Sequence, residues 1–239
     1  MFGNMQMMEM EQQTIGEIVK EVTENIAERS SLKRGLYLER IKNAQNTKIR
    51  KDLLSCGNLA HAIAGCNLTE KREISSGYKP NIGIVSAYND MLSAHKPYEN
   101  YPSKIKKIIS ENDGTCQFAG GVPAMCDGVT QGQVGMELSL FSRDVIAQST
   151  AVALSHNVFD GAVMLGICDK IVPGLLMGCL SFGHLPVIFI PAGPMTTGIS
   201  NKEKKLAREA YINKEISKKE LLKIESKSYH SPGTCTFYG

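Results

Sequence analysis

Hydrophobic side chains follow two different patterns along this chain of 239 residues. In the N-terminal part they recur at helical spacing, which predicts an amphipathic helix over residues 13–28. A second helix follows, for which Ser30 or Ser31 provides an N-cap. After a cluster of turn-forming residues the pattern changes. We therefore expect a helical N-terminal section over residues 1–80 and a separate domain over residues 81–239.

In this second part, short apolar runs alternate with longer amphipathic segments. Such alternation is typical of the α/β fold class, in which helices flank a parallel sheet. Ligands bind to such sheets outside the carboxyl ends of the strands. We expect strands at 81–87, 115–118, 162–167 and 187–190, and helices at 98–109, 135–156 and 172–183. The helix at 135–156 should turn inward the apolar side chains of Leu138, Phe141, Val145, Ile146 and Val152.

Charge and composition exclude several classes of protein. A net charge of +3 is too small to indicate a nucleic-acid partner. No apolar run approaches the ~20 residues that span a bilayer, so we expect no membrane association. The first residues lack the basic and apolar regions of a signal peptide, which predicts a cytoplasmic protein. Residues 201–228 mix both signs of charge and predict two solvated amphipathic helices.

Cysteine usage leaves a metal site open. The chain has seven cysteines, and an odd number without a secretory pattern argues against a disulfide framework. The Cys-x-x-Cys spacing of structural zinc sites is absent from the sequence. Cys66 and Cys179 lie among small apolar residues and are predicted to pack in the interior. The remaining options are buried thiols, a metal site built from distant cysteines, or a catalytic thiol.

The tripeptide Cys168-Asp169-Lys170 directly follows the strand expected at 162–167. A thiolate suits iron or zinc, whereas a carboxylate suits magnesium or manganese. Asp127 could add a further oxygen ligand, and Cys235 a further thiolate, with Cys126 in reserve. The plain alternative is a loop that contains one buried cysteine and two solvated charges.

Two more segments have the composition of a binding site. Residues 86–95 place Asn89, Asp90 and His95 after the first expected strand. Residues 120–132 are rich in glycine, which allows the backbone to approach a ligand closely.

Six ordered motifs resemble the dihydroxy-acid/phosphogluconate dehydratase family, and within it the phosphogluconate branch. The resemblance extends over almost the whole chain from about residue 30. The motifs are Leu54-Ser-Cys-Gly-Asn-Leu-Ala-His61, Ser86-Ala-Tyr-Asn-Asp-Met-Leu-Ser-Ala-His95, Gly121-Val-Pro-Ala-Met-Cys-Asp-Gly128, Phe141-Ser-Arg-Asp144, Leu165-Gly-Ile-Cys-Asp-Lys170 and Ser231-Pro-Gly-Thr-Cys235.

The resemblance implies a set of metal ligands. Cys168 and Cys235 would hold an iron–sulfur cluster, and Asp127 and Asp169 would bind Mg²⁺ or Mn²⁺. Lys170 matches a lysine that is carbamylated and binds metal in the dihydroxy-acid branch. That branch also has a third cluster cysteine in the segment that corresponds to residues 89–95, where this chain has none. The resemblance therefore implies a 4Fe-4S cluster, with a 2Fe-2S cluster as the alternative, and it leaves the role of Cys126 open.

The implied activity belongs to the Entner–Doudoroff pathway. It is the dehydration of a sugar-acid phosphate, 6-phospho-D-gluconate, to 2-dehydro-3-deoxy-6-phospho-D-gluconate, with the cluster as Lewis acid. Asp169 and Lys170 would be the catalytic residues of this chain, and His95 a weaker candidate for proton transfer. The family assigns the base to a β-rich C-terminal domain that these 239 residues lack.

We therefore expect the chain to be inactive alone and the full-length protein to be a homodimer. Two alternatives stay open. One is a dehydratase that acts on a dihydroxy acid or another sugar acid. The other is a non-catalytic iron–sulfur protein.

Overall fold

A computed structural model describes residues 14–45, 50–196 and 198–235 of the chain. The chain divides into two compact units, residues 1–46 and residues 47–239. The predicted domain boundary at residue 80 falls inside the second unit, and as a domain assignment it stays a prediction.

The described part of the first unit is helix α1 (Ile15–Gln45). The prediction of two helices here was wrong, because the backbone stays helical through the expected break. Ser30 does not cap a helix: its hydroxyl donates to the carbonyl of Ile26 at 2.7 Å. A serine that bonds back by one turn fits inside a helix, and therefore it does not end one.

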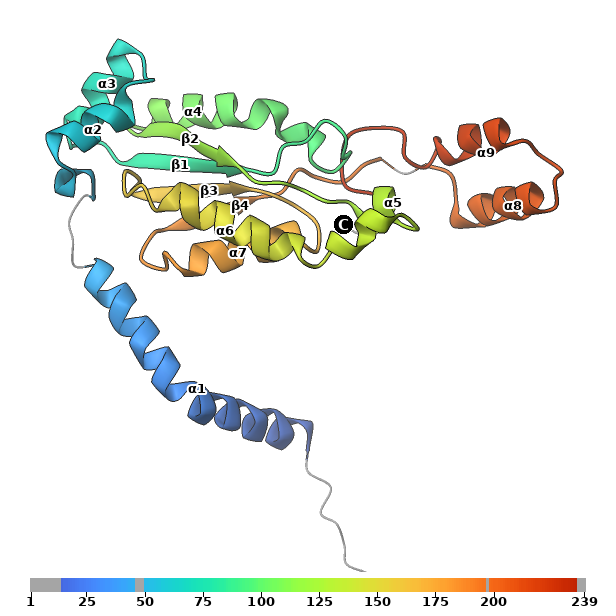
Figure 1. The fold of residues 1–239 in the computed structure, drawn as a ribbon, viewed down its shortest axis with the longest axis horizontal. Helices are drawn as coiled ribbons and strands as arrows, with labels where there is room; N and C mark the ends of the chain where they lie inside the picture. Colours follow the sequence, from blue (N-terminus) through green and yellow to red (C-terminus); the bar gives the residue numbers. More distant parts are fainter. Residues whose placement is uncertain (1–13, 46–49, 197, 236–239) are drawn as a thin grey trace, which may run out of the picture. The chain divides into compact units, whose positions relative to one another are not determined.

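The second unit is built on a four-stranded sheet in the order β2-β1-β3-β4. All three strand pairs are parallel, which confirms the predicted fold class. Figure 1 shows helix α4 on one side of the sheet and helices α6 and α7 on the other. The strands are β1 (Asn81–Ser86), β2 (Thr115–Gly121), β3 (Gly161–Leu165) and β4 (Val187–Ile190).

Alternating side chains of the central strands form two hydrophobic cores. Val85 and Met164 belong to the core that also contains Ile146 of α6 and Leu175 of α7. Their strand neighbours, Ile84 and Val163, belong to the core on the face of α4. Because both faces of β1 and β3 are covered, these strands are almost entirely buried, as is usual for parallel sheets. The covering helices are α4 (Tyr101–Glu111), α6 (Ser142–Leu154) and α7 (Ile171–Leu180).

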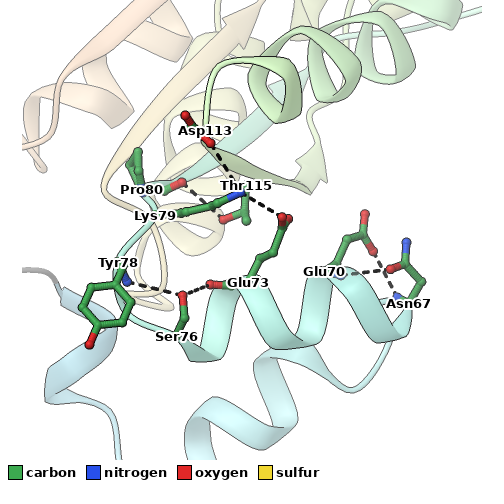
Figure 2. Close-up of polar contacts among 9 residues, drawn as sticks. All are labelled: Asn67, Glu70, Glu73, Ser76, Tyr78, Lys79, Pro80, Asp113 and Thr115. Carbon is green, nitrogen blue, oxygen red and sulfur yellow. Dashed lines mark hydrogen bonds and ion pairs between the residues drawn. The ribbon is translucent and has the colours of Figure 1, made fainter.

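Three short elements precede the sheet within the second unit: η1 (Arg50–Leu53), α2 (Cys56–Ile63) and α3 (Leu68–Ser75). Figure 2 shows how α3 is fixed to the start of β1. Asn67 and Glu70 form a capping box at the first turn of α3. Lys79 then pairs with Glu73 at 2.8 Å and with Asp113 of the turn before β2 at 3.7 Å. These contacts join the predicted turn cluster to α3 and to the sheet.

The single helix predicted over residues 135–156 was wrong. The structure has a short 3-10 helix, η3 (Val134–Leu138), followed by α6. Leu138, Phe141 and Val152 are each more than half exposed rather than inward. The inward face is set by α7, where a Cβ on Gly174 would lie 2.8 Å from the side chain of Ile146. Such close helix packing selects the face of α6 that carries Ile146.

The other predicted elements agree with the structure to within a few residues, although η2 (Lys96–Asn100) and α4 replace the single helix expected at 98–109. The charged segment forms two helices, α8 (Asn201–Ile212) and α9 (Lys218–Glu225). Cys179 is buried, as predicted. Among the described helices, none is long and apolar enough to cross a membrane.

Candidate functional site

The candidate site lies where the parallel strands end. Backbone hydrogen bonds continue past the strands here, from Ala87 to the carbonyl of Leu165 at 2.8 Å and from Val122 to that of Ser86 at 3.0 Å. These bonds align the loops that follow β1, β2 and β3. The chain therefore brings three of the predicted motifs to one edge of the sheet, where α/β folds bind ligands.

Lys170 joins the two loops that carry the predicted carboxylates. Its ammonium lies 2.6 Å from an oxygen of Asp127 and 3.3 Å from an oxygen of Asp169. The side chains of Lys170 and Asp127 are only 2% and 13% exposed, whereas Asp169 is 53% exposed. Two carboxylates thus converge on one point occupied by a buried cation, and one of them faces solvent.

Burial and hydrogen bonding have opposite effects on the pKa values of Asp127 and Lys170. Burial raises the pKa of Asp127, but hydrogen bonds from Lys170 and Ser139 outweigh it and leave the pKa lowered. Burial likewise lowers the pKa of Lys170, and its bonds to Asp127 and Asp169 raise it above the usual value. Both groups are therefore charged at neutral pH. Ser139 donates to Asp127 at 2.7 Å. The sequence offered no signal for this contact, because Ser139 lies in an ordinary amphipathic run.

Cys168 has an unusual backbone conformation between β3 and α7. Its φ is +79°, in the left-handed region that residues other than glycine rarely adopt. Such strain costs roughly 1–3 kcal/mol and tends to occur at functional sites. The half-buried thiol is thereby held in a fixed position at the end of the sheet.

The thiols of Cys126 and Cys235 affect the pKa of Cys168. Burial raises the pKa of Cys168 to about 11, and the neighbouring Cys126, Cys235 and Asp169 add to this effect, in that order. All three thiols are half-buried and free. The two predicted cluster cysteines and the one whose role the sequence left open are thus near enough for Cys126 and Cys235 to affect the pKa of Cys168.

Backbone bonds hold the segment that ends in Cys235 against the sheet edge. The amide of Gly233 donates to the carbonyl of Ser93 at 2.8 Å, and the amide of Thr234 donates to that of Gly193 at 2.9 Å. Gly233 has φ +131°, and a Cβ there would lie 2.6 Å from the backbone nitrogen of Met195. Glycine is therefore required beside Cys235.

His95 is buried next to the Cys168 loop. It is 1% exposed, and its Nε2 lies 3.2 Å from the carbonyl oxygen of Ile167. Burial lowers the pKa of His95 to about 4, so the ring is neutral and Nε2 is the protonated nitrogen. Nδ1 is buried and has no hydrogen-bond partner among the described residues. The unprotonated Nδ1 of His95 can therefore accept a hydrogen bond from a ligand.

Asn89 and Asp90, from the same predicted motif, have other roles. The side chain of Asn89 accepts from the amide of Met91 at 2.8 Å, as in a turn. Asp90 is 74% exposed and pairs with Lys96 at 2.6 Å. His95 is therefore the member of this motif that lies against the site.

The types of donor present, carboxylates and thiols, are those that the two groups implied by the resemblance would need. Among the described residues, no three His, Cys, Asp or Glu side chains converge closely enough to hold a single metal ion. The two carboxylates would need Lys170 or a substrate to complete such a site. A cluster of four irons is wider than one ion, so its thiolates need not converge on one point.

This geometry agrees with the comparison with known protein families. Residues 79–239 match the family model described as dihydroxy-acid/6-phosphogluconate dehydratase N-terminal. The chain belongs to this family of dehydratases.

Individual relatives point to one branch of the family. The chain is 57% identical to the phosphogluconate dehydratases of Rhizobium meliloti and Escherichia coli K12, over 91% of its own length and 36% of theirs. It is 38% identical to the dihydroxy-acid dehydratase of Lachnospira eligens, over 66% of its own length and 29% of that protein's. The chain thus spans about a third of the length of the curated relatives it matches.

Proposed function

We propose that this chain is the cluster- and metal-binding part of a phosphogluconate dehydratase. The reaction is the removal of water from 6-phospho-D-gluconate to give 2-dehydro-3-deoxy-6-phospho-D-gluconate. The observation that carries the proposal is the buried ammonium of Lys170 between the carboxylates of Asp127 and Asp169. The higher identity to phosphogluconate dehydratases supports this substrate over a branched dihydroxy acid.

Cys168 and Cys235 would hold a 4Fe-4S cluster, and Asp127 and Asp169 would hold Mg²⁺ or Mn²⁺. Once bound, these groups supply Lewis-acid chemistry, which makes the C3 hydroxyl a better leaving group and neutralises the substrate carboxylate. The proton at C2 becomes acidic only when that carboxylate is neutralised. The site therefore has to keep its two carboxylates in place before the substrate arrives.

The residues around the two carboxylates have different roles in this site. Ser139 and Lys170 fix the orientation of Asp127, while the exposed Asp169 faces the side from which a substrate enters. A divalent cation between the carboxylates requires Lys170 to give up its positive charge. Carbamylation, in which the neutral amine adds carbon dioxide and releases a proton, would do so and would provide another oxygen ligand. This is the modification that the resemblance to the dihydroxy-acid branch implies.

The proposal extends to the whole protein. We place it in the cytoplasm and expect it to act as a homodimer. We also expect the isolated chain to show no turnover, because the base that removes the C2 proton would come from the part that its longer relatives have in addition.

A chimera tests the function directly. The chain replaces the matching 36% of the Escherichia coli phosphogluconate dehydratase, which is 57% identical over this region. Under anaerobic conditions the chimera should dehydrate 6-phospho-D-gluconate within about tenfold of the parent rate. Dihydroxyisovalerate, assayed beside it, should be a far poorer substrate. Preference for dihydroxyisovalerate would contradict the proposal.

The substitution Asp169→Asn in the chimera tests the metal role. It should lower the rate by about a thousandfold or more, because the neutral amide is a poor ligand for a hard cation, while the absorption of the cluster stays unchanged. Asp113→Asn is the matched control, since that carboxylate is 97% exposed and lies before β2. If the Asp169→Asn chimera keeps its activity, the chain is an iron–sulfur protein without the proposed magnesium chemistry.

A further inference from the structure

The side chain of Cys126 neither caps a helix nor packs fully into a core. It precedes the short helix α5 (Asp127–Thr130) in an extended conformation, with φ −117° and ψ 117°. Its side chain makes no capping hydrogen bond to that helix. The thiol is half-buried, whereas Cys116 and Cys179 are fully buried in the cores. Cys126 is therefore positioned differently from the cysteines that serve packing.

The fold joins the loop that contains Cys126 to the loop that contains Cys168. The contact of 2.6 Å between Asp127 and Lys170 joins the residue after Cys126 to the loop that contains Cys168. Ser139 fixes the second oxygen of the same carboxylate at 2.7 Å. The position of Cys126 relative to Cys168 is thus set by a buried ion pair rather than by a loose loop.

We propose that Cys126 is the third thiolate ligand of the cluster that Cys168 and Cys235 hold. The inference rests on the proposed function, because it requires that the chain binds an iron–sulfur cluster. Three thiolates leave one of four irons without a protein ligand, and that open position is what Lewis-acid chemistry on a substrate needs. Each thiol gives up its proton to solvent as its sulfur lone pair binds iron, and no electron is transferred.

The arrangement also explains the missing cysteine after β1. In residues 86–95 the chain has no thiol, and the loop after β2 supplies one instead. Both loops reach the same edge, because β1 and β2 are parallel neighbours. The third cluster cysteine thus follows β2 in this chain, whereas in the dihydroxy-acid branch it lies in the segment that corresponds to the loop after β1. His95, with its buried free Nδ1, is the competing candidate for this position.

Alkylation of the unmodified chain tests the inference without any substitution. The chain is reconstituted anaerobically with ferrous iron and sulfide, treated with iodoacetamide, and examined by mass spectrometry beside the metal-free chain. Cys126 should be alkylated in the metal-free chain and protected at least tenfold in the loaded chain. Cys56 is exposed and should react equally in both. Equal labelling of Cys126 in the two states would overturn the inference.

Substitutions provide a second test of the third ligand. Cys126→Ser should lose at least half of the iron and sulfide bound per chain, or change the electron paramagnetic resonance spectrum of the reduced cluster. Cys56→Ser, the matched control, should bind both as the unmodified chain does. Circular dichroism verifies that each variant is folded. Full loading with an unchanged spectrum in Cys126→Ser would refute the third ligand, as would loss of iron only in His95→Ala.

The outcomes separate the inference from the function on which it rests. If the unmodified chain takes up neither iron nor sulfide, the proposed cofactor is wrong and the inference fails with it. If the unmodified chain is loaded and Cys126 stays reactive, the cofactor stands and only the third ligand is wrong.

Discussion

Two lysines at the same edge of the sheet each pair with two carboxylates, yet their surroundings differ. Lys96 lies 2.6 Å from Asp90 and 2.8 Å from Glu99, with its side chain 33% exposed. Lys170 lies 2.6 Å from Asp127 and 3.3 Å from Asp169 but is only 2% exposed. Distance alone does not distinguish the two clusters, whereas burial does.

The difference matters because water screens exposed charges. Ion pairs at a surface contribute little to stability, since solvent and side-chain entropy offset their attraction. A buried charge that loses its partner is costly, because it has also lost its hydration. The buried pair of Lys170 and Asp127 therefore depends strongly on both partners, whereas the exposed Asp169 and the Lys96 cluster do not.

The largest effect is expected from Lys170→Met, which keeps the volume of the side chain and removes its charge. Asp127 would then be buried without a cation, so the free energy of unfolding should fall by about 3 kcal/mol. Urea denaturation of the metal-free chain measures this. Adding Asp127→Asn should restore part of the loss, because it removes the unpaired charge. If the second substitution only adds to the loss, the two residues are not coupled as we describe.

An effect of similar size concerns His95, the sequence neighbour of Lys96. Its pKa falls from 6.5 to about 4 in the folded chain, so folding favours the neutral ring. The resulting stability is fully present above pH 6.5 and is lost as the pH falls toward 4, which amounts to about 3 kcal/mol. Denaturant unfolding of the metal-free chain across this pH range measures the slope.

The variant His95→Gln keeps a donor for the carbonyl of Ile167 but cannot titrate. It should flatten the dependence of stability on pH. His61→Gln is the matched control, because His61 is exposed. An unchanged slope in His95→Gln would show that another group is responsible for the acid sensitivity.

The smallest effect is expected from Lys96→Met. Hydrogen bonds to Asp90 and Glu99 raise the pKa of Lys96, but its side chain is partly exposed and its loss leaves no buried charge, because Asp90 and Glu99 are exposed. The melting temperature should stay within the error of the unmodified chain, and activity of the chimera should be retained. A loss of stability as large as that of Lys170→Met would show that the two clusters do not differ in the way we describe.

Much of this site could be predicted from sequence, because its residues sit at strand ends. The apolar runs at 162–167 and 187–190 are short, so their assignment as strands was correct, although only the first of them is buried. The motifs after them were then expected at one edge. Errors arose where the pattern was ambiguous: residues 135–156 carry apolar side chains on more than one face, and only packing against α7 selects the face with Ile146.

Sequence by itself determined the fold class, the family and the residue types available for chemistry, because periodicity and ordered motifs are local properties. The tertiary structure decided which side chains meet. It placed Ser139 against Asp127 across 12 positions and Lys170 against Asp127 across 43, and it left Lys96 partly exposed and buried Lys170. Burial and distance between separate loops are set by how helices pack on the sheet, and no local pattern encodes them.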